Sequence, residues 1–153
     1  MCKKTYNDQG RNMNIYFCGS IAGGRSYLET YTKIVRSLQQ NDHIVLTEHI
    51  IAPDVLDQEN QLTPQQVYQR DVDWLSSADA VIAEISNPSL GVGYEIAYAL
   101  TLKKPVLALY QAGLFVSRMI TGNPDPQLQI QEYASEEEWQ QIIDTFINHM
   151  SKV

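Results

Sequence analysis

The chain has 153 residues, of which 44% are hydrophobic and 19% charged, and its formal net charge is -7. This composition fits one globular domain with a sizeable core and argues against a disordered chain. With 11 basic residues against 18 acidic ones and no dense basic run, non-specific binding to long nucleic acid is not expected. No apolar run approaches the roughly 20 residues of a membrane span, and no signal peptide is expected at the N-terminus.

Segments with the pattern of strands and helices alternate along the chain. Residues 1–12 are expected to form a flexible N-terminal tail ahead of one domain over residues 13–153. The pattern predicts strands at 13–19, 43–50, 79–85, 105–110 and 127–133, and helices at about 26–40, 64–77, 92–102, 113–120 and 135–150. Thr63 and Pro64 are typical of a helix start, and Ser135 with Glu138 is typical of a capping box. The polar, aperiodic stretch at 51–62 is expected to be a loop.

This alternation predicts an α/β fold with a single-domain, doubly wound sheet of the Rossmann or flavodoxin-like kind. We expect five parallel strands in the order 2-1-3-4-5, with helices on both faces. In such sheets a ligand binds beyond the carboxyl ends of the strands, between the first and third strands. The loops expected there are the two glycine-rich ones, "GSIAGG" at 19–24 and "SNPSLGVG" at 86–93.

Several kinds of site do not fit the sequence. "GVGYEI" lacks the third small residue of a dinucleotide fingerprint, and the Walker type of phosphate loop is absent. His43, His49 and His149 do not have metal-ligand spacing, so no metal site is expected. Cys2 and Cys18 do not form a disulfide framework, and core packing explains Cys18 better than catalysis does. A reducing, cytoplasmic setting follows from this use of cysteine.

Carboxylates remain as candidates for chemistry. Glu95 follows the second glycine-rich loop, where it either meets the positive end of a helix dipole or points into a ligand site. Asp71 interrupts the apolar face of the 64–77 helix, where a raised pKa would suit a general acid. The alternative for Asp71 is a structural pair with Arg25 or Arg70. Tyr16, ahead of the first loop, is either sheet filler or a hydroxyl that reaches a sugar or Glu95.

The segments "YFCGSIAGGR", "LTEH", "QRDVDWLSSADAVIAEISNPSLGVGYEIAYAL", "KKPVLALY" and "SRMI" occur in this order between residues 13 and 120. Together they resemble the 2'-deoxynucleoside 5'-monophosphate N-glycosidases of the nucleoside 2-deoxyribosyltransferase superfamily. The resemblance implies hydrolysis of the N-glycosidic bond to a free base and 2-deoxyribose 5-phosphate. It also implies a homodimer and a reaction that needs no metal or organic cofactor. The apolar segment at 114–120 is expected at the dimer interface.

The resemblance also implies roles for individual residues. Glu95 corresponds to the nucleophile at the anomeric carbon and Asp71 to the acid that protonates the departing base. Tyr16 corresponds to a tyrosine that positions the nucleophile and disfavours a 2'-hydroxyl. The expected phosphate ligands are side chains and backbone amides at Ser20, Ile21, Gly23, Gly24, Ser89 and Gly91, with Ser117 reaching in from the neighbouring subunit.

The first loop departs from the usual pattern of these hydrolases. They typically carry arginine where this chain has Ala22, so one charged phosphate contact is missing unless Arg25 or Arg118 replaces it. Transferases of the superfamily commonly have an aspartate six residues before the nucleophile, and Ser89 occupies that position here. The leading hypothesis is therefore a nucleotide N-hydrolase. A deoxyribosyltransferase and a non-catalytic nucleotide-binding module are the alternatives, and the sequence does not indicate a base preference.

Overall fold

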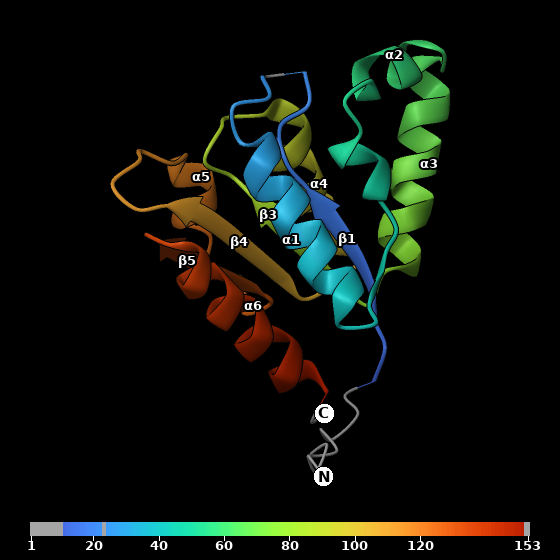
Figure 1. Ribbon diagram of the computed structural model, residues 1–153. Coiled ribbons are helices and arrows are strands. Elements are labelled where there is room, and N and C mark those ends of the chain that lie inside the picture. Colours follow the sequence, from blue (N-terminus) through green and yellow to red (C-terminus); the bar gives the residue numbers. More distant parts are fainter. Residues whose placement is uncertain (1–10, 23, 152–153) are drawn as a thin grey trace, which may run out of the picture.

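The computed structural model describes residues 11–22 and 24–151, so most of the expected N-terminal tail lies outside the described residues. Helices and strands alternate as expected (Figure 1). They run in the order β1 (Asn14–Cys18), α1 (Leu28–Gln40), β2 (Ile44–Val45), the 3-10 helix η1 (Glu48–Ile51), α2 (Val55–Asn60), α3 (Pro64–Ser77), β3 (Ala80–Glu84), α4 (Leu90–Thr101), β4 (Val106–Gln111), α5 (Arg118–Thr121), β5 (Leu128–Tyr133) and α6 (Glu136–Met150).

The five strands form one sheet in the order β2-β1-β3-β4-β5, and every neighbouring pair is parallel. Tyr16 lies opposite Val81, and Ile82 lies opposite Leu107. The expected fold class and strand order are confirmed. Because the winding reverses between β1 and β3, the crevice beyond their carboxyl ends is the preferred ligand position of this fold.

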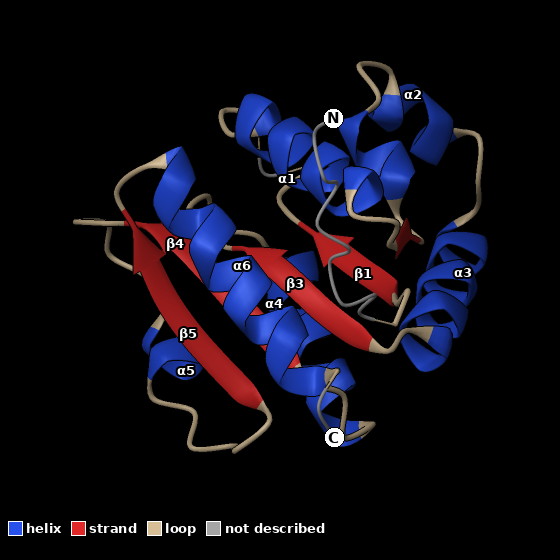
Figure 2. Ribbon diagram, turned by 60° about the horizontal axis from the view of Figure 1, so that its bottom comes forward, coloured by secondary structure: helices blue, strands red, loops and turns tan. Residues whose placement is uncertain are grey.

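Helices cover both faces of the sheet (Figure 2). On one face, β-strand residues such as Phe17 pack with Ile34 of α1 and Ile143 of α6. On the other face, Tyr16 packs with Leu75 of α3 and Ile96 of α4. Successive side chains of a strand point to opposite faces, so Phe17 and Tyr16 enter different cores. The candidate site residues Tyr16, Asp71 and Glu95 are therefore all supplied from the α3–α4 side.

Two helix starts follow their sequence signals. At α3, the Thr63 hydroxyl accepts a hydrogen bond from the Gln66 N–H at 3.2 Å, and the Gln66 side chain accepts one from the Thr63 N–H at 2.9 Å. At α6, Ser135 accepts from the Glu138 N–H, but the Glu138 carboxylate accepts from the N–H of Ala134 at 2.6 Å. The capping box expected at Ser135 is therefore displaced by one residue, and the helix start is the same.

The second strand is much shorter than the 43–50 segment that was expected. β2 ends at Val45, and the side chain of Thr47 then makes the hydrogen bonds to β1 that a strand backbone would otherwise make. Its Oγ1 accepts from the Phe17 N–H at 3.0 Å and donates to the Phe17 carbonyl at 2.5 Å. A side chain thus replaces the next step of the strand ladder, and the chain turns into η1.

Three other boundaries also differ from expectation. The stretch at 51–62, expected to be a loop, contains α2, a six-residue helix in which only Val55 is buried. One buried side chain gives no periodicity, so the pattern could not predict this helix. The helix expected over 113–120 is limited to α5, and α4 begins at Leu90 instead of Val92. In the described part of the chain, no helix has both the length and the apolar character needed to cross a membrane.

Candidate active site

The two glycine-rich loops lie side by side, as the topology predicts. The Asn87 side-chain amide donates a hydrogen bond to the Gly24 carbonyl at 3.1 Å and so joins the second loop to the first. Gly19 allows the chain to pass the aromatic ring of Tyr31, because a Cβ there would lie 2.7 Å from the ring. The Tyr31 hydroxyl in turn accepts from the Ser20 N–H at 3.0 Å. The first loop therefore leaves β1 along a defined path.

One polar side chain of the first loop has no hydrogen-bond partner among the described residues. Ser20 is fully buried, and its Oγ has no hydrogen-bond partner among the described residues. A buried hydroxyl without a partner is costly, so a ligand that uses it is favoured. Gly24 has φ +121°, a conformation that L side chains rarely adopt. Ile21 is partly exposed beside them, and Gly23 lies outside the described residues.

The second loop leads into the N-terminus of α4. Ser89 is the N-cap, and its hydroxyl accepts from the Val92 N–H at 3.4 Å. A Cβ at Gly91 would meet only the Ser89 hydroxyl, at 3.8 Å, and one at Gly93 would meet nothing within 4 Å. Backbone conformation therefore does not demand these glycines. Their effect is to keep the first turn of the helix bare, where N–H groups and the helix dipole attract anions.

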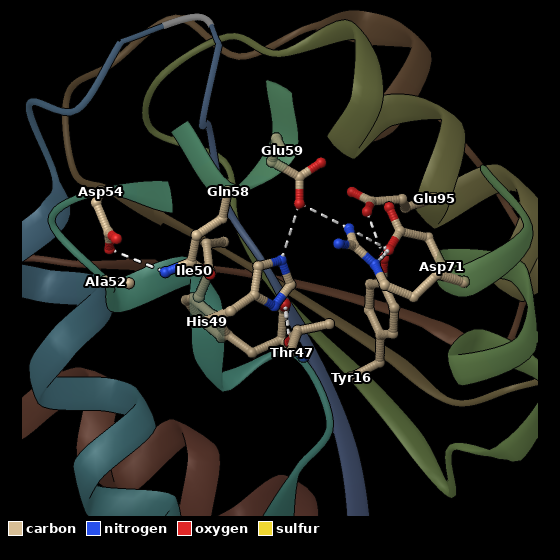
Figure 3. Close-up of polar contacts among 12 residues, drawn as sticks. Tyr16, Thr47, His49, Ile50, Ala52, Asp54, Gln58, Glu59, Asp71 and Glu95 are labelled. Carbon is tan, nitrogen blue, oxygen red and sulfur yellow. Dashed lines mark hydrogen bonds and ion pairs between the residues drawn. The ribbon is translucent and has the colours of Figure 1, made fainter. Parts of the chain in front are cut away.

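Glu95 extends from the second turn of α4 toward β1 (Figure 3). The Tyr16 hydroxyl donates to Glu95 Oε1 at 2.5 Å. Burial raises the pKa of Glu95 to about 7, against the effect of the hydrogen bonds from Tyr16 and Cys18, while the nearby charge of Asp71 adds to the increase. Burial also raises the pKa of the Tyr16 hydroxyl, so it remains a donor. A carboxylate held in this way is a suitable nucleophile at neutral pH.

Asp71 projects from α3 on the same side of the sheet (Figure 3). Its Oδ1 accepts a hydrogen bond from Nε of Arg70 at 2.8 Å and lies 2.8 Å from Nη2 of the same guanidinium as an ion pair. Burial raises the pKa of Asp71, and Arg70 opposes that increase. Of the two structural partners weighed for Asp71, Arg70 is the one in contact. Asp73 lies two residues further on, about 200° round the helix, and is exposed.

Sequence reasoning did not identify Glu59 and His49 as neighbours of Asp71. Glu59 belongs to α2, and its Oε1 lies 2.8 Å from Nη2 of Arg70 and 3.2 Å from Nε2 of His49. The guanidinium of Arg70 also lies over the ring of Trp74, 4.9 Å from its centroid. These residues come from three separate elements, η1, α2 and α3, so sequence spacing alone could not relate them.

The arginines proposed to replace the missing loop arginine occupy different positions. Arg25 donates through Nη2 to the carbonyls of Ile50, at 2.5 Å, and Ala52, at 3.5 Å, which ties the first loop to η1. Arg118 lies over the ring of Phe115, 5.9 Å from its centroid. Neither contact involves Glu95 or Asp71.

Ser117 is exposed and caps α5, where its hydroxyl accepts from the Met119 N–H at 3.3 Å. Across residues 11–22 and 24–151, no hydrogen bond or ion pair joins Ser117 to Tyr16, Asp71 or Glu95. The structure thus brings the three catalytic candidates together and leaves Ser117 apart from them. In the same residues, no group of three or more His, Cys, Asp or Glu side chains is arranged to hold a metal ion.

The chain matches known proteins over most of its length. The family profile for nucleoside 2-deoxyribosyltransferase matches residues 15–115. A protein of Methanosarcina mazei, provisionally named 2'-deoxynucleoside 5'-phosphate N-hydrolase 1, is 42% identical over 139 residues, which cover 91% of this chain and 86% of the relative. The 5-hydroxymethyl-dUMP N-hydrolase of Danio rerio is 40% identical over 144 residues, covering 92% and 99%.

A solved structure supports the fold. The CMP N-glycosidase of Clostridium botulinum superposes with a TM-score of 0.64, at 17% identity, over 87% of this chain and 98% of that one. At this identity the likeness concerns the fold alone. The family match and the two sequence relatives go further, because they cover most of the chain, the relatives at about 40% identity, and show its family. The chain belongs to the nucleoside 2-deoxyribosyltransferase family.

Proposed function

We propose that the protein hydrolyses the N-glycosidic bond of 2'-deoxynucleoside 5'-monophosphates and releases a free base and 2-deoxyribose 5-phosphate. The observation that carries this proposal is the pairing of Tyr16 with Glu95 beside Asp71, next to two linked glycine-rich loops. Sequence relatives at about 40% identity carry N-hydrolase names, and both names refer to deoxynucleotides. Two carboxyl groups of unlike environment are the minimal set for glycosidic cleavage.

In the first step, Glu95 attacks the anomeric carbon as a carboxylate. The bond from that carbon to the base nitrogen breaks, and Asp71 gives its proton to the departing base. In the second step, Asp71 takes a proton from water, which attacks the same carbon and releases Glu95. The hydroxyl of Tyr16 holds the nucleophile in position near the 2'-carbon of the sugar. Both carboxyl groups return to their starting state, and the scheme uses no metal or organic cofactor.

The 5'-phosphate is assigned to the two glycine-rich loops. Hydroxyls at Ser20 and Ser89, backbone amides at Ile21, Gly23, Gly24 and Gly91, and the N-terminus of α4 are its proposed ligands. In support, the Ser20 Oγ is buried without a described partner, and the first turn of α4 is bare at Gly91. Hydrogen bonds to a charged group contribute about 1.5–3 kcal/mol each, so a nucleotide should be preferred over a nucleoside by orders of magnitude.

We also propose a homodimer in which Ser117 completes the partner's phosphate site. Large apolar side chains are exposed beside it: Phe115 is 80% exposed and Met119 84%, while Leu90 at the start of α4 is 96% exposed. A surface of this kind favours a protein partner. A second copy is the occupant because Ser117 lies in the same segment and is exposed, apart from the catalytic candidates of its own chain.

The dimer is tested by sedimentation at micromolar concentration with Phe115→Asp, and with Ile44→Asp as a control at an exposed apolar residue on β2. Phe115→Asp should give monomers with a raised KM for the monophosphate, and the control should remain dimeric. A wild-type monomer with full activity would contradict the dimer.

The proposed reaction takes place in the cytoplasm, in keeping with the free buried thiol of Cys18.

Deoxyribosyl transfer is the second candidate function, because the matching family profile carries a transferase name. The deciding experiment incubates the protein with deoxynucleoside monophosphates, deoxynucleosides and ribonucleotides, with and without an added acceptor base. Hydrolysis predicts free base from the monophosphates whether or not an acceptor is present. A better reaction with nucleosides, together with capture of the sugar by the acceptor base, supports transfer.

A further inference from the structure

Asp71 is both the proposed acid and a partner of a cation. Nε of Arg70 donates a hydrogen bond to Oδ1 of Asp71 at 2.8 Å, and Nη2 lies 2.8 Å from the same oxygen as an ion pair. A guanidinium in contact with a carboxyl group favours its ionised form. General acid catalysis requires the protonated form. Arg70 therefore works against the rise in pKa that burial gives Asp71, and against its use as an acid.

Glu59 provides the cation with a second carboxylate partner. Its Oε1 lies 2.8 Å from Nη2 of Arg70, so one nitrogen of the guanidinium bridges two carboxylates. Glu59 is only partly exposed, and its side chain enters the site from α2 (Figure 3). The ring of Trp74 lies under the guanidinium. Arg70 can therefore release Asp71 and keep a carboxylate partner and an aromatic surface.

We propose that Arg70 is a counter-ion shared by two carboxylates, and that Glu59 is the positioning residue that retains it when Asp71 takes up the proton destined for the base. This role rests on the proposed function. On protonation, Nε loses its acceptor while Nη2 stays on Glu59. When Asp71 has delivered the proton, Arg70 returns to it. Neither Glu59 nor Arg70 need touch the reacting atoms.

The charges around Asp71 agree with this exchange. Titratable groups face it from every element packed there: Arg70 of α3, Glu59 of α2, His49 of η1, Tyr16 and Cys18 of β1 and Glu95 of α4. Burial raises the pKa of Asp71, Arg70 lowers it, and the charge of Glu59 raises it. Removal of Glu59 should therefore lower the pKa of Asp71 in two ways, directly and by leaving Arg70 with one carboxylate.

The test measures the pKa of Asp71 by carbon NMR of the side-chain carboxyls, assigned by comparison with Asp71→Asn. In Glu59→Gln we expect a decrease of at least about one pH unit, a tenfold loss of proton affinity. In an Arg70→Gln background the same change should have less than about a third of that effect, because only direct repulsion between the carboxylates remains. Asp57→Asn removes a charge from an exposed residue of the same helix and should leave the pKa unchanged.

Two outcomes would overturn the proposal. One is a pKa of Asp71 that is the same in Glu59→Gln and wild type. The other is an equal decrease with and without Arg70, which would leave a direct charge effect and no shared cation. In the wild type, the Nε–H resonance of Arg70 must titrate with the same midpoint as Asp71, and this readout does not depend on the stability of any variant.

Kinetics separate this inference from the proposed function. If the wild type releases no base from any deoxynucleotide, the proposed function fails, whatever the pKa of Asp71. If it does release base, Glu59→Gln should slow base release from dGMP at least about tenfold more than base release from 7-methyl-dGMP. The base of 7-methyl-dGMP already carries a positive charge and leaves without a proton. Equal slowing of the two substrates would refute the role of Glu59 and leave hydrolysis itself intact.

Discussion

Two carboxylates lie at the carboxyl end of the same sheet, one on each face, and their surroundings differ. Glu84, the last residue of β3, is fully buried. It accepts hydrogen bonds from the Tyr133 hydroxyl at 2.9 Å, from the Ser86 hydroxyl and from the Ser86 N–H at 3.3 Å. Glu95 lies on the opposite face, keeps some exposed surface and accepts a hydrogen bond from Tyr16 near the carboxylate of Asp71.

Burial raises the pKa of both carboxyl groups, so a raised pKa does not distinguish them. What differs is their set of partners. The donors around Glu84 belong to the protein and join β3 to β5, and Ser86 also accepts from the Gln111 N–H at 2.8 Å at the end of β4. Glu95 lies near Asp71, a carboxyl group that can exchange a proton. Partial exposure and the neighbouring carboxyl group, and not burial, are therefore what make Glu95 the proposed catalytic residue of the two.

Replacement of Glu95 should have the largest effect on turnover. Glu95→Gln keeps the shape of the side chain but removes the nucleophile, so base release should fall by at least about a thousandfold. Thermal unfolding should stay close to that of the wild type. Glu84→Gln is the matched change on the other face, and a similar loss of turnover in both variants would abolish the distinction drawn between them.

Loss of the acid should have the next largest effect. Asp71→Asn should lower kcat/KM by about 10²–10⁴-fold, the usual range for general acid catalysis, and the loss should be smallest for bases that leave easily. Rates with a series of bases of different leaving ability provide the measurement. Asp73→Asn, on the exposed side of the same helix, is the control and should be neutral. A loss that is uniform across the series would argue against proton donation by Asp71.

Tyr16→Phe should reduce turnover by about tenfold, since it removes one hydrogen bond to a charged group. The hydrogen bond lowers the pKa of Glu95, which is about 7, so its loss should raise that pKa further. Glu95 must be ionised to react, and activity is lost as pH falls through this pKa. The acid limb of the pH-rate profile should therefore move to higher pH. The preference for deoxyribose over ribose should also weaken, and an unchanged limb and sugar preference would exclude both roles.

A smaller change in activity is expected from a substitution in the first glycine-rich loop. Ala22→Arg adds a cation to the first loop, where the 5'-phosphate is proposed to bind. The KM for a deoxynucleoside monophosphate should fall by a few-fold to about tenfold, while the KM for the nucleoside should be nearly unchanged. An equal effect on both substrates would show that the added arginine does not contact a phosphate.

Glu84→Gln should have the smallest effect on turnover and a clear effect on stability. An amide cannot accept from the Ser86 and Tyr133 donors as a carboxylate does, so unfolding should become easier by about 1–3 kcal/mol. Turnover well below the melting temperature should stay within about threefold of wild type. Glu132→Gln changes an exposed residue next to Tyr133 and serves as the control for denaturant unfolding. A Glu84→Gln variant that is stable but inactive would assign a catalytic role to Glu84 and contradict this account.

The sequence predicted the fold well because its strands are strongly patterned. β1 and β3 are buried on both faces and end in glycine-rich turns, and this pattern led directly to the observed strand order. The pattern did not predict the structure where individual side-chain contacts set the backbone conformation. Thr47 ends β2 through its bonds with Phe17, and α2 contains one buried residue, so neither feature has a periodic signal.

The candidate site was predictable to a similar degree. Tyr16, Asp71 and Glu95 were proposed from their places in the pattern and from the family resemblance, and the structure brings them together. Glu59 lies on the helix that was expected to be a loop, so its link to Arg70 depends on tertiary structure alone. The roles of all these residues stay predictions until the variants are measured.

The stereochemical course of the reaction tests the central claim most directly. Attack by Glu95 followed by attack of solvent inverts the anomeric carbon twice, so the product keeps the configuration of the substrate. With methanol as a competing acceptor, the account predicts the β-methyl glycoside of 2-deoxyribose 5-phosphate, identified by NMR before it can equilibrate. The α-methyl glycoside would mean a single displacement by solvent, and it would contradict the assignment of Glu95 as the nucleophile.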